Sequence, residues 1–199
     1  MRRLLATACL TAAIAAASAA RSQEASPPVP ADKPAAAPSA PAAGMGEAVT
    51  VEMKAQDGSS RGTVKITPTP NGLLLEANLS GFGKGTGDRI HGFHFHQTGK
   101  CEGNFESAGG HYNPTNKEHG YLSANGPHAG DMPNFVLADD GTARFAVFNP
   151  MVRMTGGEAP LNDTDGTVIM IHGMADDYKS APAGMAGERV ACGVVFKAS

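Results

Sequence analysis

Histidines are concentrated in one part of this chain, and they constrain its fold more than any other feature. The sequence has seven histidines, and six of them lie between Asp88 and Asp131. The stretch includes the alternating run Phe93-His94-Phe95-His96. Because successive side chains of a strand point to opposite faces, we expect both imidazoles on one face, where they can bind one metal ion. Imidazole suits copper and zinc, although a lone His-x-His pair also occurs as an ordinary polar strand face.

The residues that follow favour a metal site over a polar strand face. Further along come three more histidines and an aspartate, namely His111, His119, His128 and Asp131. This segment is rich in Gly, Asn and Pro without a lasting hydrophobic period, which predicts a long loop. Long loops in compact domains are usually functional or disordered. Three imidazoles and one carboxylate make a closed tetrahedral zinc set, so we expect a metal to order the loop.

Alternating apolar residues and turn signals predict strands in the rest of the domain. Turns are indicated at Asp57-Gly58, Asn71-Gly72 and Asp139-Asp140-Gly141. With the His-x-His run, the expected strands cover 49–53, 63–66, 73–79, 93–96, 135–137, 143–148, 167–171 and 190–197. Residues 149–166 match no expected element. Eight strands and no helix predict an all-β sandwich or barrel.

The first 46 residues are expected to lie outside this domain. Residues 1–20 have a basic start, an apolar run and small residues before a cleavage point, as in an export signal. A lipoprotein anchor at Cys9 is the less favoured alternative, because Ala6 rather than Leu stands three residues before it. Residues 21–46 are mostly Ala, Pro and Ser and predict a flexible tether. The folded domain is then 47–199.

Several motifs, in order and with compatible spacing, resemble the copper/zinc superoxide dismutase family. They are His91–His96, Ala108–Pro114, Gly126–Asp131, Ile171-His172 and Gly187–Gly193. The resemblance covers residue 47 to the C-terminus, and the short segment between His172 and Arg189 is similar to the bacterial secreted, periplasmic branch. It implies a flattened eight-stranded Greek-key β-barrel, an immunoglobulin-like sandwich, with a long metal-binding loop and a short electrostatic loop.

The resemblance also implies one copper and one zinc per chain, with every ligand position filled. Copper would be bound by His94, His96, His111 and His172. Zinc would be bound by His111, His119, His128 and Asp131. Copper would cycle by one electron as superoxide becomes oxygen and hydrogen peroxide, whereas zinc has no redox chemistry and would be structural.

Three residues receive more specific roles from the resemblance. The shared ligand His111 is expected to be catalytic, leaving copper on reduction and carrying a proton. Arg189 is expected to be catalytic too, by attracting and orienting the superoxide anion. Asp176 is expected to join a copper histidine to a zinc histidine through hydrogen bonds, and the neighbouring Asp177 is the alternative. His91 stays outside the ligand set.

The number of cysteines and the net charge restrict the compartment and the partners that we expect for this protein. With Cys9 in the expected leader, Cys101 and Cys192 remain, and an even pair in an exported protein predicts a disulfide; two unpaired buried thiols are the alternative. The net charge of −3, without a basic tract, argues against nucleic acid as a partner. We expect an exported, periplasmic or otherwise extracytoplasmic protein that acts on superoxide. A homodimer and envelope attachment through the tether are left open.

Two rival functions are compatible with a metal-binding domain of this kind. The first is a dismutase-like module that binds or delivers copper or zinc without significant turnover. The second is a structural metal domain on a tether. The complete ligand set together with Arg189 favours the enzyme, which would protect the extracytoplasmic space from superoxide.

Overall fold

The computed structural model describes residues 46–83 and 89–199, and this part of the chain is almost entirely β-structure. The strands are β1 Val49–Lys54, β2 Ser60–Thr69, β3 Gly72–Leu79, β4 Ile90–His91, β5 Phe93–His96, β6 Phe135–Val136, β7 Ala143–Asn149, β8 Thr167–His172 and β9 Arg189–Phe196. One short 3₁₀ turn, Glu106–Ala108, is the helical element of the described residues. No helix within these ranges is long and apolar enough to cross a membrane. The expected export signal and nearly all of the tether fall outside the described residues.

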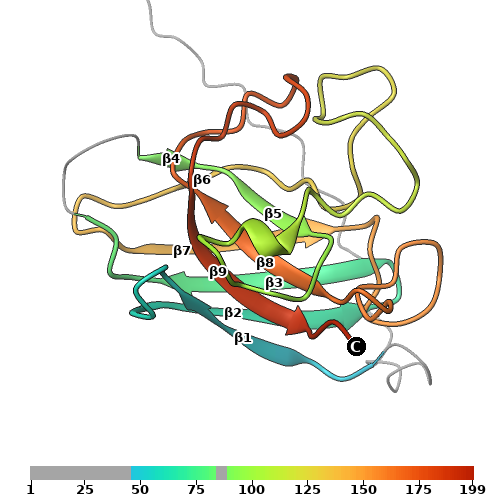
Figure 1. The fold of residues 1–199 in the computed structure, drawn as a ribbon, viewed down its shortest axis with the longest axis horizontal. Helices are drawn as coiled ribbons and strands as arrows, with labels where there is room; N and C mark the ends of the chain where they lie inside the picture. Colours follow the sequence, from blue (N-terminus) through green and yellow to red (C-terminus); the bar gives the residue numbers. More distant parts are fainter. Residues whose placement is uncertain (1–45, 84–88) are drawn as a thin grey trace, which may run out of the picture. The chain divides into compact units, whose positions relative to one another are not determined.

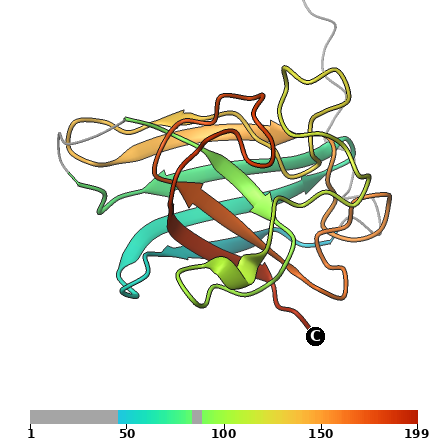
Figure 2. The same ribbon diagram turned by 45° about the horizontal axis from the view of Figure 1, so that its top comes forward.

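The strands form one curled antiparallel sheet, so the predicted all-β architecture is confirmed. Seven strands follow the order β5-β8-β9-β1-β2-β3-β7, and β4 pairs with β6. Only Gly92 separates β4 from β5, so they are two parts of the one strand expected around the His-x-His run. The pair of β4 and β6 continues the curl, and β6 approaches β7 at the other end of the seven-stranded order. Figures 1 and 2 show how far the sheet curls towards a closed barrel.

Strand β5 is buried on both faces, which explains its unusual sequence. Phe93 and Phe95 are fully buried in the apolar core. The ring of Phe93 meets Phe145 of β7 edge-on, with ring centres 5.3 Å apart. His94 and His96, on the opposite face, are also almost completely buried, although both are polar. The cover over that face is the long loop between β5 and β6, so the strand alternation places the two imidazoles beneath this loop.

The sequence did not assign residues 149–166. Asn149 ends β7, and residues 150–166 form a folded loop that packs into the core. The amide of Arg153 donates to the carbonyl of Ala159 at 3.0 Å, and the amide of Leu161 donates back to the carbonyl of Arg153 at 2.8 Å. The hydroxyl of Tyr112, beside His111, donates to the carbonyl of Pro160 at 2.6 Å. The loop therefore contacts the metal-binding loop next to His111.

A disulfide joins the metal-binding loop to the last strand, as predicted. Cys101 and Cys192 are bonded across a sequence separation of 91 residues. Cys192 of β9 lies in a small apolar cluster with Phe105 and Ala108 of the loop and Val168 and Met170 of β8. The alternative of two unpaired thiols is therefore wrong, and the loop is anchored at its beginning by a covalent bond.

Candidate metal centre

The metal-binding loop returns to the edge of the sheet and pairs with β5. Because β5 ends the seven-stranded order, its outer edge is available for hydrogen bonds. The amide of Tyr112 donates to the carbonyl of Phe95 at 2.8 Å, and the amide of Phe95 donates to Gly130 at 2.9 Å. These contacts form isolated bridges that set His96 opposite His111 and His94 opposite Asp131. A Cβ at Gly130 would lie 2.5 Å from the carbonyl oxygen of Phe95, so this close approach requires glycine.

Two groups of ligating side chains meet below the loop. The first group is His94, His96, His111 and His172. The second group is His111, His119, His128 and Asp131. Within each group the ligand atoms lie within 4.8 Å of one another. His111 belongs to both groups, and these are the two sets that the family resemblance implies.

The two nitrogens of His111 face different groups. Its Nδ1 lies 2.8 Å from Oδ1 of Asp131. The same carboxylate approaches Nδ1 of His119 at 3.2 Å and Nδ1 of His128 at 3.4 Å. On the other side, Nε2 of His96 and Nε2 of His172 lie 3.3 Å apart, and the ring centre of His94 is 4.0 Å from that of His111. One imidazole thus connects the two sites.

Unsatisfied buried nitrogens show that both groups suit metal ions. Five ring nitrogens are buried without a hydrogen-bond partner among the described residues. Four belong to the ligand groups, namely His94 Nδ1, His111 Nε2, His119 Nδ1 and His128 Nδ1, and the fifth is Nε2 of His91. Burying a polar atom without a partner is costly. A metal ion that accepts the lone pairs would remove this cost, and imidazole is a ligand for both copper and zinc. The donor sets therefore fit these two metals.

Most of the remaining ring nitrogens are held by hydrogen bonds, as ligand imidazoles require. Nδ1 of His96 lies 3.0 Å from the carbonyl oxygen of Gly109, and Nδ1 of His172 lies 3.4 Å from that of Gly187. Nε2 of His94 and Nε2 of His119 both contact the carboxylate of Asp176. Such contacts fix the tautomer and orientation of a metal-binding ring.

The pKa values of four histidines of the centre are shifted in the metal-free protein. Burial lowers the pKa of His111 to about 4 and that of His172 to about 3, and it also holds the pKa of His96 well below its usual value. A lowered pKa favours the neutral ring, whose lone pair can bind a metal ion. Burial also opposes protonation of His119, but the nearby carboxylates of Asp131 and Asp176 outweigh it and raise the pKa of His119 to about 9.

The two aspartates stay ionised although they are buried. Burial alone would raise the pKa of Asp131, but hydrogen bonds from His111 and His119 hold this pKa far below its ordinary value. Burial likewise opposes ionisation of Asp176, and contacts with His119 and His94 lower its pKa. Two buried carboxylates therefore supply negative charge close to the site that would receive zinc.

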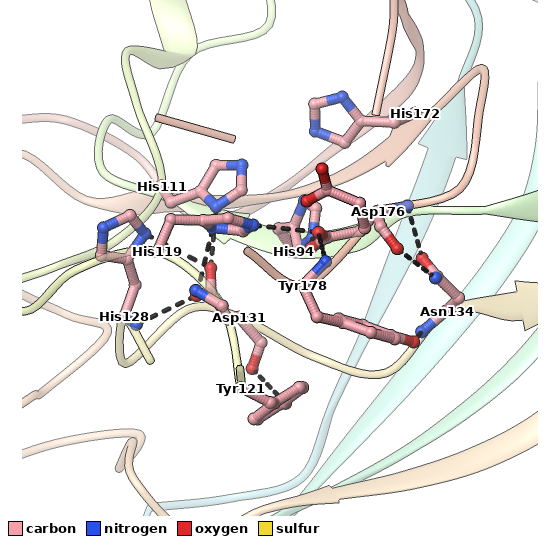
Figure 3. A network of polar contacts seen from close by, with 12 residues as sticks. His94, His111, His119, Tyr121, His128, Asp131, Asn134, His172, Asp176 and Tyr178 are labelled. Atoms are coloured by element: carbon pink, nitrogen blue, oxygen red, sulfur yellow. Dashed lines mark hydrogen bonds and ion pairs between the residues drawn. The ribbon is translucent and has the colours of Figure 1, made fainter. Parts of the chain in front are cut away.

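Asp176 lies between the two groups and touches both (Figure 3). Its Oδ2 accepts from Nε2 of His94 at 2.8 Å, and its Oδ1 accepts from Nε2 of His119 at 2.9 Å. Its side chain has no exposed surface. Two residues that the sequence interpretation did not identify, Asn134 and Tyr178, surround it. A single asparagine or tyrosine carries no local signal for such a role.

Arg189 stands at the entrance on the side of the first group. Its Nη1 donates to the carbonyl of Phe105 and its Nη2 to that of Gly109, both at 2.6 Å. The Gly109 oxygen is the one that Nδ1 of His96 contacts, so one carbonyl links Arg189 to this histidine. Arg189 also lines a hollow of about 430 Å³, together with Gln56, Asn104, Glu106, Gly187 and Glu188. A partly exposed guanidinium therefore lies beside this hollow and is joined to His96 through one carbonyl.

His91 lies outside both groups, as expected. Its Nδ1 is 2.8 Å from the carbonyl oxygen of His172. Its ring stacks on Phe135 with ring centres 5.6 Å apart. It supports the backbone of His172 and offers no nitrogen to either group of ligands.

Comparison with known proteins agrees with this geometry. Residues 60–195 match the model of the family described as copper/zinc superoxide dismutase. A "Superoxide dismutase [Cu-Zn] 1" of Aquifex aeolicus is 44% identical over 142 residues, which cover 70% of this chain and 82% of the relative. A "Superoxide dismutase [Cu-Zn]" of Caulobacter vibrioides is 40% identical over 152 residues, covering 74% and 85%.

Solved structures share the fold. The "Cu/Zn superoxide dismutase from Brucella abortus" is 31% identical, with a TM-score of 0.60, over 75% of this chain and 99% of that chain. A "SOD-like protein from Bacillus subtilis" is 34% identical, with a TM-score of 0.68, over 73% and 97%. The match therefore covers the described domain and most of each relative.

Proposed function

This chain belongs to the copper/zinc superoxide dismutase family and is a superoxide dismutase that uses copper and zinc; we propose which of its residues hold each metal and act on superoxide. His94, His96, His111 and His172 bind copper. His111, His119, His128 and Asp131 bind zinc. The observation that carries this assignment is the position of His111, whose two nitrogens face two complete sets of ligand atoms.

The reaction converts two superoxide anions and two protons into oxygen and hydrogen peroxide. Copper supplies the one-electron oxidation and reduction of superoxide at this site. Arg189 binds and orients the anion, because two carbonyls hold its guanidinium in place and a planar guanidinium presents further donors in a fixed geometry. His111 can carry a proton on Nε2 only while this nitrogen is not bound to copper, and Nε2 has no other hydrogen-bond partner among the described residues.

We further propose that the enzyme works outside the cytoplasm and protects that space from superoxide. The Cys101–Cys192 disulfide supports this location, because disulfides persist in oxidising compartments such as the bacterial periplasm. The basic and apolar start of the chain has the features of an export signal. A homodimer and attachment to the envelope through residues 21–46 are separate hypotheses that a sedimentation or fractionation experiment can test.

The decay of superoxide after pulse radiolysis tests the proposal directly. The protein loaded with copper and zinc should reach a rate constant near the diffusional ceiling, about 10⁸–10⁹ M⁻¹s⁻¹, and the rate should fall as salt is added. A negligible rate with both metals confirmed in place would refute turnover and favour a metal-binding module.

Replacing Arg189 tests the role of its charge. Arg189→Gln should lower the rate about 10-fold or more while both metals remain bound, since focused positive charge raises on-rates by about 10–1000-fold. The control is Arg144→Gln, which makes the same change of charge on β7, away from the hollow that Arg189 lines. Equal effects of the two substitutions would show that only net charge matters.

A further inference from the structure

Asn134 joins the metal-binding loop to the loop that carries Asp176. It lies immediately before β6, three residues after Asp131. Its Nδ2 donates to the carbonyl of Asp176 at 2.8 Å, and its Oδ1 accepts from the amide of Asp176 at 2.9 Å. One side-chain amide therefore satisfies both main-chain groups of Asp176, in the way that a neighbouring strand would (Figure 3).

Tyr178 completes the same connection from the other loop. Its hydroxyl accepts a hydrogen bond from the amide of Asn134 at 2.7 Å. Its own amide donates to Oδ1 of Asp176 at 2.6 Å, and its carbonyl accepts from the amide of Leu122 at 2.9 Å. Its ring lies 5.5 Å from that of Tyr121. Tyr178 adopts a left-handed backbone with φ of 60°, which is uncommon for a tyrosine and is held here by these contacts.

Asp176 needs such support because its position is demanding and its loop has no regular structure. Residues 173–188 contain no helix or strand. The carboxylate must nevertheless reach His94 on β5 and His119 on the metal-binding loop at 2.8 and 2.9 Å, with no exposed surface. In Figure 3, Asn134 lies across Asp176 from His94 and His119, and the side chain of Tyr178 runs towards Asn134. The imidazoles alone do not fix the backbone behind the carboxylate.

We propose that Asn134 and Tyr178 act together as a clamp that positions the Asp176 carboxylate and thereby sets the affinity of the zinc site. They are positioning residues, because neither lies in either ligand group. The inference rests on the proposed function in one respect, namely that His119 is a zinc ligand and His94 a copper ligand. Removing the clamp lets Asp176 shift, and His119 then loses the hydrogen bond that orients its ring.

The expected effect is a weaker zinc site in a folded protein. Substituting the groups that orient metal-ligating histidines typically costs 10–100-fold in metal affinity. Asn134→Ala removes both bonds to the backbone of Asp176 and should raise the zinc dissociation constant about 10-fold. Tyr178→Phe removes one hydroxyl and leaves the Asn134 side chain in place, so we expect a smaller rise of about 3-fold.

A double-mutant cycle with Asp176→Asn separates positioning from a general loosening of the loop. The zinc dissociation constant is measured by competition with a chromophoric chelator on the copper-loaded full chain. If Asn134 acts through Asp176, Asn134→Ala should have less than about a 2-fold effect once Asp176 is Asn. Equal effects of Asn134→Ala in both backgrounds would overturn the proposal, as would an unchanged dissociation constant in the single variant.

Thr167→Val is the matched control, because it also deletes a buried hydrogen bond to a main-chain carbonyl. Thr167 is fully buried at the start of β8, and its hydroxyl donates to Leu161 at 3.0 Å. It should lower the free energy of unfolding and leave zinc affinity within about 2-fold, since it lies away from the Asp176 network. A loss of zinc equal to that of Asn134→Ala would mean that any loss of stability weakens the site.

The experiment still decides if a variant does not fold or if the proposed function is wrong. If Asn134→Ala does not fold, the same cycle with Tyr178→Phe decides, and additivity with Asp176→Asn refutes the clamp. The zinc dissociation constant is measured without any superoxide turnover, so it does not depend on the proposed function. Tight zinc binding that depends on the clamp, together with no decay of superoxide, would refute the function alone.

Discussion

Removing the Cys101–Cys192 disulfide should destabilise this fold more than most single changes. The bond closes a loop with a sequence separation of 91 residues. In the chain-entropy model, a loop of this size restricts the unfolded chain by about 4–5 kcal/mol. The suitable variant is Cys101→Ala/Cys192→Ala, because alanine does not bury an unpaired hydroxyl in the apolar cluster around Cys192.

The stabilisation by the disulfide can be compared with that from the hydrogen bonds that also attach the metal-binding loop. Arg189 donates two hydrogen bonds to it, and the edge of β5 makes further bonds with it. A typical hydrogen bond contributes about 0.5–1.5 kcal/mol net, so these attachments do not replace the covalent bond. For a domain of this size, 4–5 kcal/mol corresponds to a decrease in Tm of about 10–15 °C.

Calorimetry and urea unfolding of the metal-free protein provide the assay. Metals are omitted because they join the same loop to β5 and β8 and would add their own binding energy to the unfolding reaction. The wild-type protein treated with a reductant should unfold at nearly the same temperature as the double variant. A loss below about 1 kcal/mol in both samples would refute the argument that the long closed loop restricts the unfolded chain.

Two further predictions concern the zinc side of the centre. The pKa of His119 is raised from 6.5 to about 9, so a proton stabilises the metal-free fold below about pH 6.5, and this stabilisation is lost as pH rises through 9. Zinc must displace this proton, so the zinc affinity should fall about 10-fold for each pH unit between pH 9 and pH 7. Titration calorimetry in buffers of different ionisation enthalpy measures both the affinity and the proton release. A zinc affinity that does not change with pH would contradict the prediction. Gly120→Ala should cost more than about 2 kcal/mol in urea unfolding, because φ is +88° and a Cβ would lie 2.0 Å from the carbonyl oxygen of Tyr178. Gly103→Ala is the control, because φ is +57° and no atom lies within 4 Å of the new Cβ. It has only the backbone strain and no clash, so it should lower the free energy of unfolding by less than Gly120→Ala does.

The features that the sequence predicted correctly depend on neighbouring residues. Strand alternation places His94 and His96 on one face and Phe93 and Phe95 on the other. Turn residues separate the strands, and the predicted boundaries of β3 and β7 differ from the observed ones by one residue at most. Two cysteines beyond the expected leader allow one pairing, and the structure contains it. The family motifs predict the members of both ligand groups, because their order and spacing are visible in the chain itself, and the structure places these side chains close together.

Only the tertiary structure determined how these parts support one another. The sequence does not reveal that Arg189 and His96 share the carbonyl of Gly109, because this contact joins three separate segments. It did not assign residues 149–166, whose buried side chains follow no helical or strand period. Asn134 and Asp176 are 42 residues apart, and their paired hydrogen bonds depend on the meeting of two irregular loops. Local periodicity determines strands, whereas contacts between irregular segments depend on the whole fold, since no repeating backbone geometry relates such residues in sequence.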